Sequence, residues 1–143
     1  MTNKAWSFRA LAPGDVPFVM DNWLNSFRDS KWAGCVPNNL YREVQSACIN
    51  DLLKRGMKVT LAHDSDDPDN LIGFIAYEVR PSGEYVLHYC YVKPYIRGHG
   101  VATSLAVDAM GGLPNHFVYT HRTRSAPPGA GRWVPEIARR LKL

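Results

Sequence analysis

Three strand-like runs that follow one another along the chain constrain its fold more than any other feature. Residues 58–63, 71–79 and 84–92 are rich in β-branched, aromatic and aliphatic side chains. Two short polar turns separate them, an acidic stretch at 64–70 and Pro-Ser-Gly at 81–83. Connections this short join antiparallel neighbours. We therefore expect a three-stranded antiparallel meander at the centre of the fold.

Helical patterns precede the meander. A strand is expected at 6–12, and Asp15 can cap a following helix that tolerates Pro17 in its first turn. The buried stripe of this helix would comprise Val16, Val19, Trp23 and Phe27. After a loop at 30–39, a second helix is expected at 40–54, ended by Gly56. Its inward residues would be Val44, Cys48, Ile49 and Leu52.

The chain after the meander alternates between helix and strand. A helix is expected at 100–110, ended by the glycine pair 111–112, and a strand at 116–121. A loop at 125–131 then leads into a short basic helix at 132–143. The element order is β-α-α-β-β-β-α-β-α. It predicts an α+β fold in which a mixed, mostly antiparallel sheet of about five strands carries helices on both faces.

Length and composition narrow the class of protein. The 143 residues are enough for one domain, 1–143, with a core of its own. We expect no membrane span or secretion signal, because apolar runs are short and the start is polar. The three cysteines are an odd number in no paired spacing, so a protein of a reducing cytoplasm is expected rather than a disulfide or zinc framework. The acidic 64–70 turn lacks the glycine and glutamate of a calcium loop, so we expect no metal.

Charge is unevenly distributed along the chain. The net charge is +4, yet residues 1–92 hold nine Lys or Arg against eleven Asp or Glu, and residues 93–143 hold eight against two. The basic excess of the last third suggests an anionic ligand or partner there, unless it is a solvated basic face.

A glycine-rich turn stands between the last meander strand and the next helix. It reads Arg97-Gly98-His99-Gly100 and enters the helix at Val101. The first amides of a helix lack internal partners and carry partial positive charge, and glycines let an anion approach the backbone. The turn therefore predicts a pyrophosphate cradle, with a tight ligand-free turn as the alternative. The Walker and dinucleotide patterns do not fit, since a lysine and a third glycine are missing.

The residues around this turn resemble a known family signature. Val92, Pro94, Arg97, Gly100 and Ala102 fill the pattern V-x-P-x-x-[QR]-x-x-G-x-[GA]. With the element order, this is similar to the GCN5-related N-acetyltransferase (GNAT) superfamily across nearly the whole chain. The resemblance implies acetyl-CoA as co-substrate, direct acetyl transfer to an amine, and a thioester held where strand 84–92 splays from strand 116–121. The family fold usually continues with two further strands, and we expect none after the last helix of this chain.

The resemblance also implies which residues bind coenzyme A. Backbone amides of the turn would hold the pyrophosphate, and main-chain groups of the strand end would hold the pantetheine arm. The residues concerned are Cys90, Tyr91, Val92, Arg97, Gly98, His99, Gly100, Val101, Ala102, Thr103 and Ser104.

Acetyl transfer to an amine needs a base, because an alkylammonium has a pKa near about 10. Alternation along the strand would put Glu84, Val86, His88 and Cys90 on one face and Tyr85, Leu87, Tyr89 and Tyr91 on the other. His88 matches a histidine of the arylalkylamine acetyltransferases and suits proton removal through a water. Glu84 is the second candidate, and a packed strand histidine is the structural alternative. The family tyrosine acid has no match, so Tyr119 is the nearest candidate.

The acceptor amine is left open, as a small molecule or a protein. Trp32, in a loop, is the better contact candidate, whereas Trp23 and Phe27 are more typical of a core. A second subunit could complete the acceptor site as a homodimer. Two other functions stand beside catalysis: a non-catalytic binding protein on the same fold, and nucleic-acid association through the basic end. The latter would use Arg122, Arg124, Arg132, Arg139, Arg140 and Lys142, with Trp133 among them.

Overall fold

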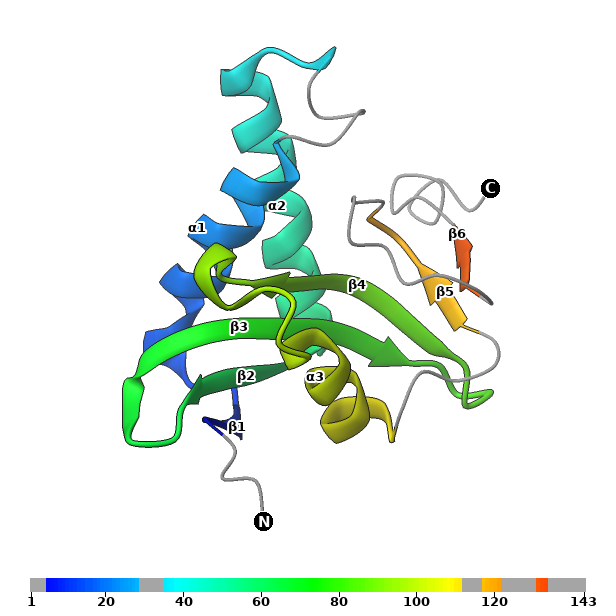
Figure 1. Ribbon diagram of the computed structural model, residues 1–143. Coiled ribbons are helices and arrows are strands. Elements are labelled where there is room, and N and C mark those ends of the chain that lie inside the picture. The colour runs from blue at the N-terminus through cyan, green and yellow to red at the C-terminus, as the bar shows by residue number, and fades with distance from the viewer. Residues whose placement is uncertain (1–4, 29–34, 112–116, 122–130, 134–143) are drawn as a thin grey trace.

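The computed structural model describes residues 5–28, 35–111, 117–121 and 131–133. These residues form one six-stranded sheet in which the strands lie side by side in chain order (Figure 1). The strands are β1 (Trp6–Ala10), β2 (Lys58–Asp64), β3 (Asp67–Val79), β4 (Tyr85–Val92), β5 (Phe117–Tyr119) and β6 (Gly131–Trp133). The first four pair antiparallel, whereas β5 and β6 join in parallel.

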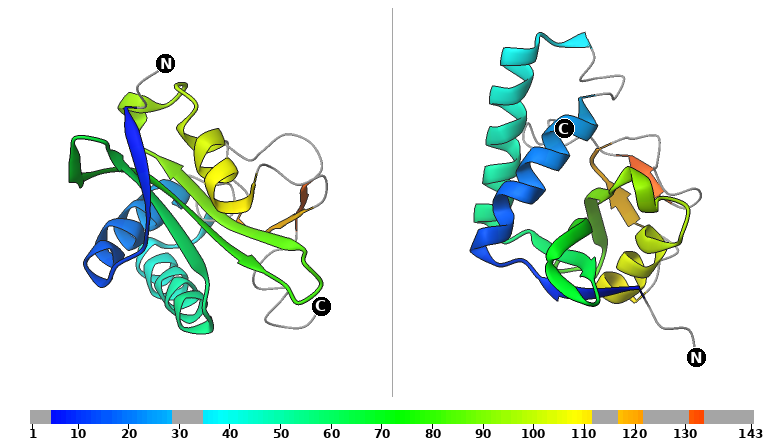
Figure 2. Two further views of the ribbon diagram at one scale, coloured as in Figure 1. Left: turned by 90° about the horizontal axis from the view of Figure 1, so that it is seen from below. Right: turned by 60° about the vertical axis from the view of Figure 1, so that its left-hand side comes forward.

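Helices cover both faces of this sheet, as the sequence predicts (Figure 2). Helices α1 (Val16–Phe27) and α2 (Asn38–Arg55) pack on one face, and α3 (Val101–Met110) packs on the other. The α1/α2 core includes Trp23, Tyr41, Ile49, Leu52, Leu61, Phe74 and Tyr89. The α3 core includes Val101, Leu105, Met110, Ile72, Ile75, Leu87 and Phe117. The predicted α+β class is confirmed.

The meander forms as expected, with two changes at its turns. Strand β3 begins at Asp67, so the acidic turn is tighter than predicted and residues 67–70 belong to the strand. Strand β4 begins at Tyr85, and Glu84 belongs to the preceding turn. Gly73 in β3 lies against the end of β4, where an added Cβ would meet the Tyr91 carbonyl oxygen at 2.5 Å. A side chain at this position would therefore force β3 and β4 apart.

The two early helices follow the predicted pattern except on one face of α2. Val19, Trp23 and Phe27 are buried, while Val16 is half-buried. In α2, Val44 is 46% exposed, so its predicted inward position is wrong. The inward stripe instead comprises Tyr41, Gln45, Cys48, Ile49 and Leu52. A polar residue, Gln45, takes the place expected for Val44, and its hydrogen bond to His121 accounts for its burial.

The described end of the chain differs from expectation. Gly131, Arg132 and Trp133 form β6 beside β5, although the sequence predicts the end of a loop and the start of a helix there. The parallel ladder of β5 offers backbone partners at this position, and such pairing outweighs local propensity in a short segment. The remainder of the predicted basic helix, residues 134–143, lies outside the described residues.

Candidate active site

The glycine-rich turn connects β4 to α3. A short 3-10 turn, η3 (Pro94–Ile96), is followed by Gly98 and Gly100 with φ angles of 85° and 86°. These are left-handed conformations that L side chains rarely adopt, which explains both glycines. Helix α3 then begins at Val101, and its first hydrogen bond runs from the Ser104 amide to the Gly100 carbonyl. The preceding amides therefore point toward the turn, as an anion site requires.

The predicted turn residues differ in what they can offer a ligand. Val101 is buried in the α3 core, so only its main chain faces the turn. His99, Ala102 and Thr103 are exposed, and Ser104 is half-buried. Apart from that of Val101, the side chains next to this turn are therefore open to solvent at least in part.

Arg97 ties the turn to the end of β4. Its Nε donates to the Val92 carbonyl oxygen at 2.8 Å, and its guanidinium lies 5.8 Å from the centre of the Tyr91 ring. Burial raises the pKa of Tyr91, and the Arg97 charge opposes that rise. The side chain therefore braces the strand end while remaining exposed to solvent.

Strand β4 contains a bulge at the predicted base. Tyr77 pairs with Leu87 and Ala76 pairs with Tyr89, which leaves His88 as an extra residue in β4. The bulge shifts the side-chain alternation by one residue. Tyr89 and Tyr91 therefore pack on the α1/α2 face, while Leu87 and Cys90 pack on the α3 face. The predicted grouping of Cys90 with His88 and of Leu87 with Tyr89 is wrong, because strict alternation does not allow for a bulge.

The bulge also lies where β4 and β5 part. Strand β5 pairs with Tyr85, Val86 and Leu87, and one further bond joins the Thr120 amide to the Leu87 carbonyl at 3.0 Å. Beyond this point no further backbone pairing joins β4 to the described residues that follow β5. The Lys93 amide bonds to Ile72 on β3, and successive amides point to alternate edges, so the Val92 and Cys90 amides face the edge that β5 leaves. Burial raises the pKa of the Cys90 thiol to about 12, so the thiol stays protonated.

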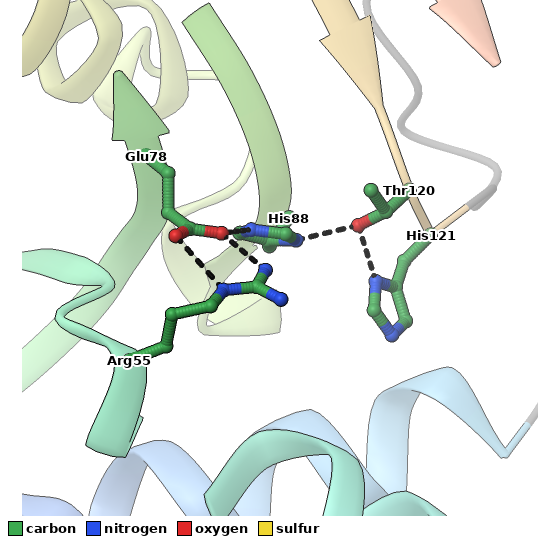
Figure 3. Close-up of polar contacts among 5 residues, drawn as sticks. All are labelled: Arg55, Glu78, His88, Thr120 and His121. Atoms are coloured by element: carbon green, nitrogen blue, oxygen red, sulfur yellow. Dashed lines mark hydrogen bonds and ion pairs between the residues drawn. The ribbon is translucent and has the colours of Figure 1, made fainter. Parts of the chain in front are cut away.

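His88 is fully buried and bonded at both ring nitrogens (Figure 3). Its Nε2 lies 2.6 Å from Glu78 Oε1, and its Nδ1 lies 2.7 Å from Thr120 Oγ1. Arg55 holds the same Glu78 carboxylate through both oxygens. Because the ring is buried and both nitrogens are bonded, His88 is part of a polar network and does not contact a substrate directly.

The network continues to a second histidine. Thr120 Oγ1 lies 2.9 Å from His121 Nδ1, and His121 Nε2 lies 3.0 Å from Gln45 Nε2. The His121 ring packs against Trp23, Phe27 and Tyr89. We name this set the buried polar chain. It comprises Glu78, His88, Thr120, His121 and Gln45, and the exposed Arg55 side chain holds its Glu78 end.

The titration of this chain follows from its surroundings. Burial by itself raises the pKa of Glu78, but hydrogen bonds and charge from His88 and Arg55 outweigh it and lower that pKa to about 2. Burial, together with the neighbouring His88, lowers the pKa of His121 to about 3. At neutral pH, Glu78 is therefore a carboxylate and His121 is a neutral imidazole.

The other two predicted catalytic residues lie elsewhere. Glu84 sits in the β3–β4 turn, where its carboxylate pairs with Arg80 at 2.5 Å. Tyr119 is half-buried against the α3 core, and its ring lies 6.3 Å from that of Phe117. Tyr119 is thus on the opposite face of the sheet from the buried polar chain. Trp32, the predicted acceptor contact, lies outside the described residues.

Sequence reasoning missed most of the buried polar chain. The sequence does contain a signal for it, because polar residues interrupt apolar strands at two places. These are Glu78, near the end of one strand, and the Thr120-His121 pair, at the end of another. Gln45 was hidden because the inward face of α2 was taken one residue away. Trp23, whose ring packs against His121, places another polar atom in this region. Its indole nitrogen is buried and has no hydrogen-bond partner among the described residues.

Two further observations concern metals and membranes. Within residues 5–28, 35–111, 117–121 and 131–133, no group of three or more His, Cys, Asp or Glu lies close enough together to hold a metal ion. No described helix is long and apolar enough to cross a bilayer. Of the six basic residues named for nucleic-acid binding, only Arg132 belongs to the described residues, in β6.

Comparison with known proteins identifies the class. The model of the acetyltransferase (GNAT) family matches residues 21–111, which is well over half of the chain. The chain therefore belongs to the GNAT acetyltransferase family. Among curated protein sequences, none matches it significantly.

Solved structures share the fold at low sequence identity. The histone acetyltransferase HPA2 and related acetyltransferase of Corynebacterium glutamicum superposes with a TM-score of 0.60 at 13% identity, over 75% of this chain and 71% of that one. A GNAT acetyltransferase of Brucella melitensis in complex with acetyl-CoA superposes with a TM-score of 0.56 at 16% sequence identity. The match covers 76% of this chain and 68% of that one. Escherichia coli YhbS in complex with CoA superposes with a TM-score of 0.51 at 20% sequence identity, over 76% of this chain and 57% of that one. At these identities the likeness establishes the fold.

Proposed function

We propose that this chain is an acetyl-CoA-dependent N-acetyltransferase that transfers the acetyl group directly from the thioester to an amine. One observation carries the proposal. The pairing of β4 with β5 ends at Leu87, and the strand then leads directly into the glycine turn at the start of α3. One continuous stretch, residues 88–104, could therefore supply both parts of a coenzyme A site.

The two parts match the two polar parts of coenzyme A. Amides from Gly98 to Thr103 would bind the pyrophosphate, with Arg97 supplying positive charge beside it. The Cys90 and Val92 amides would bind the pantetheine arm as an added strand edge. Family neighbours crystallised with acetyl-CoA and CoA support this assignment.

The transfer itself makes one bond and breaks one. The neutral amine nitrogen attacks the thioester carbonyl carbon, and the tetrahedral oxyanion takes a hydrogen bond from an amide near Val92. The C–S bond then breaks, and coenzyme A leaves as a thiolate that takes a proton from water. The proton lost by the amine needs a base, and His88 would be that base, acting through a water rather than by direct contact because its ring is buried.

The acceptor class and the compartment are parts of the same proposal. The acceptor carries a primary amine, on a small molecule or on a protein. The three cysteines are an odd number in no paired spacing, which favours work in a reducing cytoplasm.

The test is a product assay. The protein is incubated with acetyl-CoA and a panel of polyamine, arylalkylamine, aminoglycoside, lysine-peptide and free N-terminal peptide acceptors, and the acetylated amine is measured by mass spectrometry. We expect at least one acceptor class to be acetylated. Binding of acetyl-CoA without acetylation of any acceptor would favour a non-catalytic GNAT-fold protein. The absence of both would contradict the coenzyme A site.

A further inference from the structure

We propose that Lys93 binds the acceptor, and that the acceptor is an amine whose molecule also carries a phosphate or carboxylate group. The proposal rests on the proposed acetyl transfer and narrows its acceptor class. It starts from a row of cations and aromatic rings at the end of β4, which comprises Lys93, Phe18, Tyr91 and Arg97.

Lys93 is fixed on the α1/α2 face of the sheet. Its amide donates to the Ile72 carbonyl at 2.8 Å, which holds its backbone against β3. Its ammonium lies 5.6 Å from the centre of the Phe18 ring, and Phe18 packs against the α1/α2 core. The side chain is half-buried, as expected where a charge lies beside an aromatic ring and the carbon stem packs below it. The cation is therefore held in place at the end of the strand.

A second cation stands at the other end of the row. The Phe18 and Tyr91 rings lie 6.4 Å apart, and the Arg97 guanidinium lies 5.8 Å from the centre of the Tyr91 ring. Among the residues that the structure describes, no ion pair joins Lys93 or Arg97 to a carboxylate. Charges of one sign without a counter-charge attract an anion, so the end of β4 favours an anionic ligand.

The side of α1 that faces β4 carries no charge. Phe18, Asn22 and Ser26 lie four residues apart and share this side of the helix. Ser26 Oγ lies 2.6 Å from the Tyr89 hydroxyl, and the Asn22 amide donates to the Phe18 carbonyl of its own helix. Asp21, the acid of α1, is exposed and turned by about 100° from Asn22. An ammonium group at this side of α1 therefore meets no counter-charge.

Coenzyme A and the acceptor would approach β4 from different faces. The glycine turn leads into α3, which lies on the face opposite α1 and α2, so the pyrophosphate would lie toward α3 (Figure 2). The thioester would lie along the strand edge at the Cys90 and Val92 amides. Lys93 is the next residue, and an amine that attacks from the α1/α2 face brings the rest of its molecule past it. There an anionic group is attracted, whereas the further charges of a polyamine are repelled.

Inorganic phosphate serves as the probe for this subsite. Because coenzyme A carries phosphates of its own, the protein is first saturated with acetyl-CoA, with saturation checked by calorimetry. It is then titrated with inorganic phosphate and followed by proton–nitrogen NMR. We expect the backbone signals of Lys93 and Phe18 to shift as phosphate binds.

Three variants test whether the Lys93 charge is responsible. Lys93→Met keeps a stem on Phe18 but removes the charge, and should weaken phosphate binding by about 10-fold. Lys93→Arg keeps the charge and should retain most of the affinity. Lys58→Met removes an exposed cation of β2 and should bind phosphate as wild type does. Equal phosphate affinity in Lys93→Met and wild type would overturn the subsite.

The saturated protein also separates two sources of the anion. If phosphate shifts the Lys93 signal only in the absence of acetyl-CoA, a phosphate of coenzyme A occupies the subsite, and the assignment to the acceptor is wrong. Failure to bind acetyl-CoA at all would contradict the proposed function and this acceptor class with it. Binding of acetyl-CoA without any phosphate response would contradict the acceptor class alone.

Matched acceptors test the same preference by turnover. O-phosphoethanolamine is compared with ethanolamine, and phenylalanine with phenethylamine, beside the polyamines of the acceptor panel. We expect kcat/KM to be about 10-fold higher for the anionic member of a pair, and Lys93→Met to remove this preference by raising KM with little change in kcat. Equal rates within the pairs, or faster acetylation of a polyamine, would overturn the anionic acceptor.

Discussion

The glycine turn and the buried polar chain meet on β4, yet they are built in opposite ways. The turn is local, exposed and made of main-chain groups, and its conformation depends on two glycines with positive φ. The polar chain is buried and made of side chains from α2, β3, β4 and the end of β5. The conformation of such a turn is encoded by a few consecutive residues, whereas the buried polar chain needs a folded sheet to assemble it.

The largest expected difference between the two regions is their effect on the free energy of unfolding at acid pH. Because the pKa of His121 is lowered from 6.5 to about 3, the unfolded state binds more protons between these pH values, so the free energy of unfolding falls as the pH falls through this window. The slope is at most about 1.4 kcal/mol per pH unit. His121→Gln should flatten it, measured by urea unfolding from pH 7 to pH 3.

Loop variants provide the control for that measurement. Arg97→Lys should keep the wild-type slope, since it preserves the charge and Arg97 is not among the causes of the lowered pKa of His121. Glu78 adds a second loss of stability as the pH falls from about 4.5 to about 2, because its pKa is lowered to about 2. The slope between pH 6.5 and pH 4.5 therefore reports on His121 without Glu78. An equal slope in wild type and His121→Gln would show that His121 is charged or exposed in the native state.

Gly73→Ala should damage both regions together. The new Cβ would meet the Tyr91 carbonyl oxygen at 2.5 Å, and β4 would have to move away from β3. We expect a loss of about 1–3 kcal/mol in the free energy of unfolding, with weaker acetyl-CoA binding measured by calorimetry. Gly14→Ala, where a Cβ meets nothing within 4 Å, is the matched control. Unchanged stability in Gly73→Ala would mean that the end of β4 yields freely.

Arg97→Ala should affect the turn alone. Removing the charge beside the predicted pyrophosphate site should weaken acetyl-CoA binding by about 10-fold. Arg97→Lys keeps the charge but loses the Nε bond to Val92, so its affinity for acetyl-CoA should lie between those of wild type and Arg97→Ala. Titration calorimetry gives the three affinities. Equal affinity in all three would remove Arg97 from the site.

The same contrast explains what the sequence could predict. The turn, its helix and the meander were predicted within a few residues, because glycines, polar turns and strand patterns act locally. His88 was proposed as the base from its place on the 84–92 strand and its match to a family histidine, but its hydrogen-bond partners were not predicted. The β4 bulge broke the alternation on which face assignments rest, and Gln45 was hidden by a one-residue error on α2. Strand β6 depends on pairing with β5, which local sequence does not encode.

Binding of acetyl-CoA to a matched pair of glycine variants tests the account most directly. Gly100 and Gly83 have nearly the same φ, 86° and 88°, and an added Cβ meets nothing within 4 Å at either position. Replacing each with glutamate imposes a similar backbone cost, but Gly100→Glu also places a carboxylate at the start of α3. Calorimetry should show acetyl-CoA binding to wild type and Gly83→Glu, and at least about 100-fold weaker binding to Gly100→Glu. Equal binding to both variants would contradict a coenzyme A site at this turn.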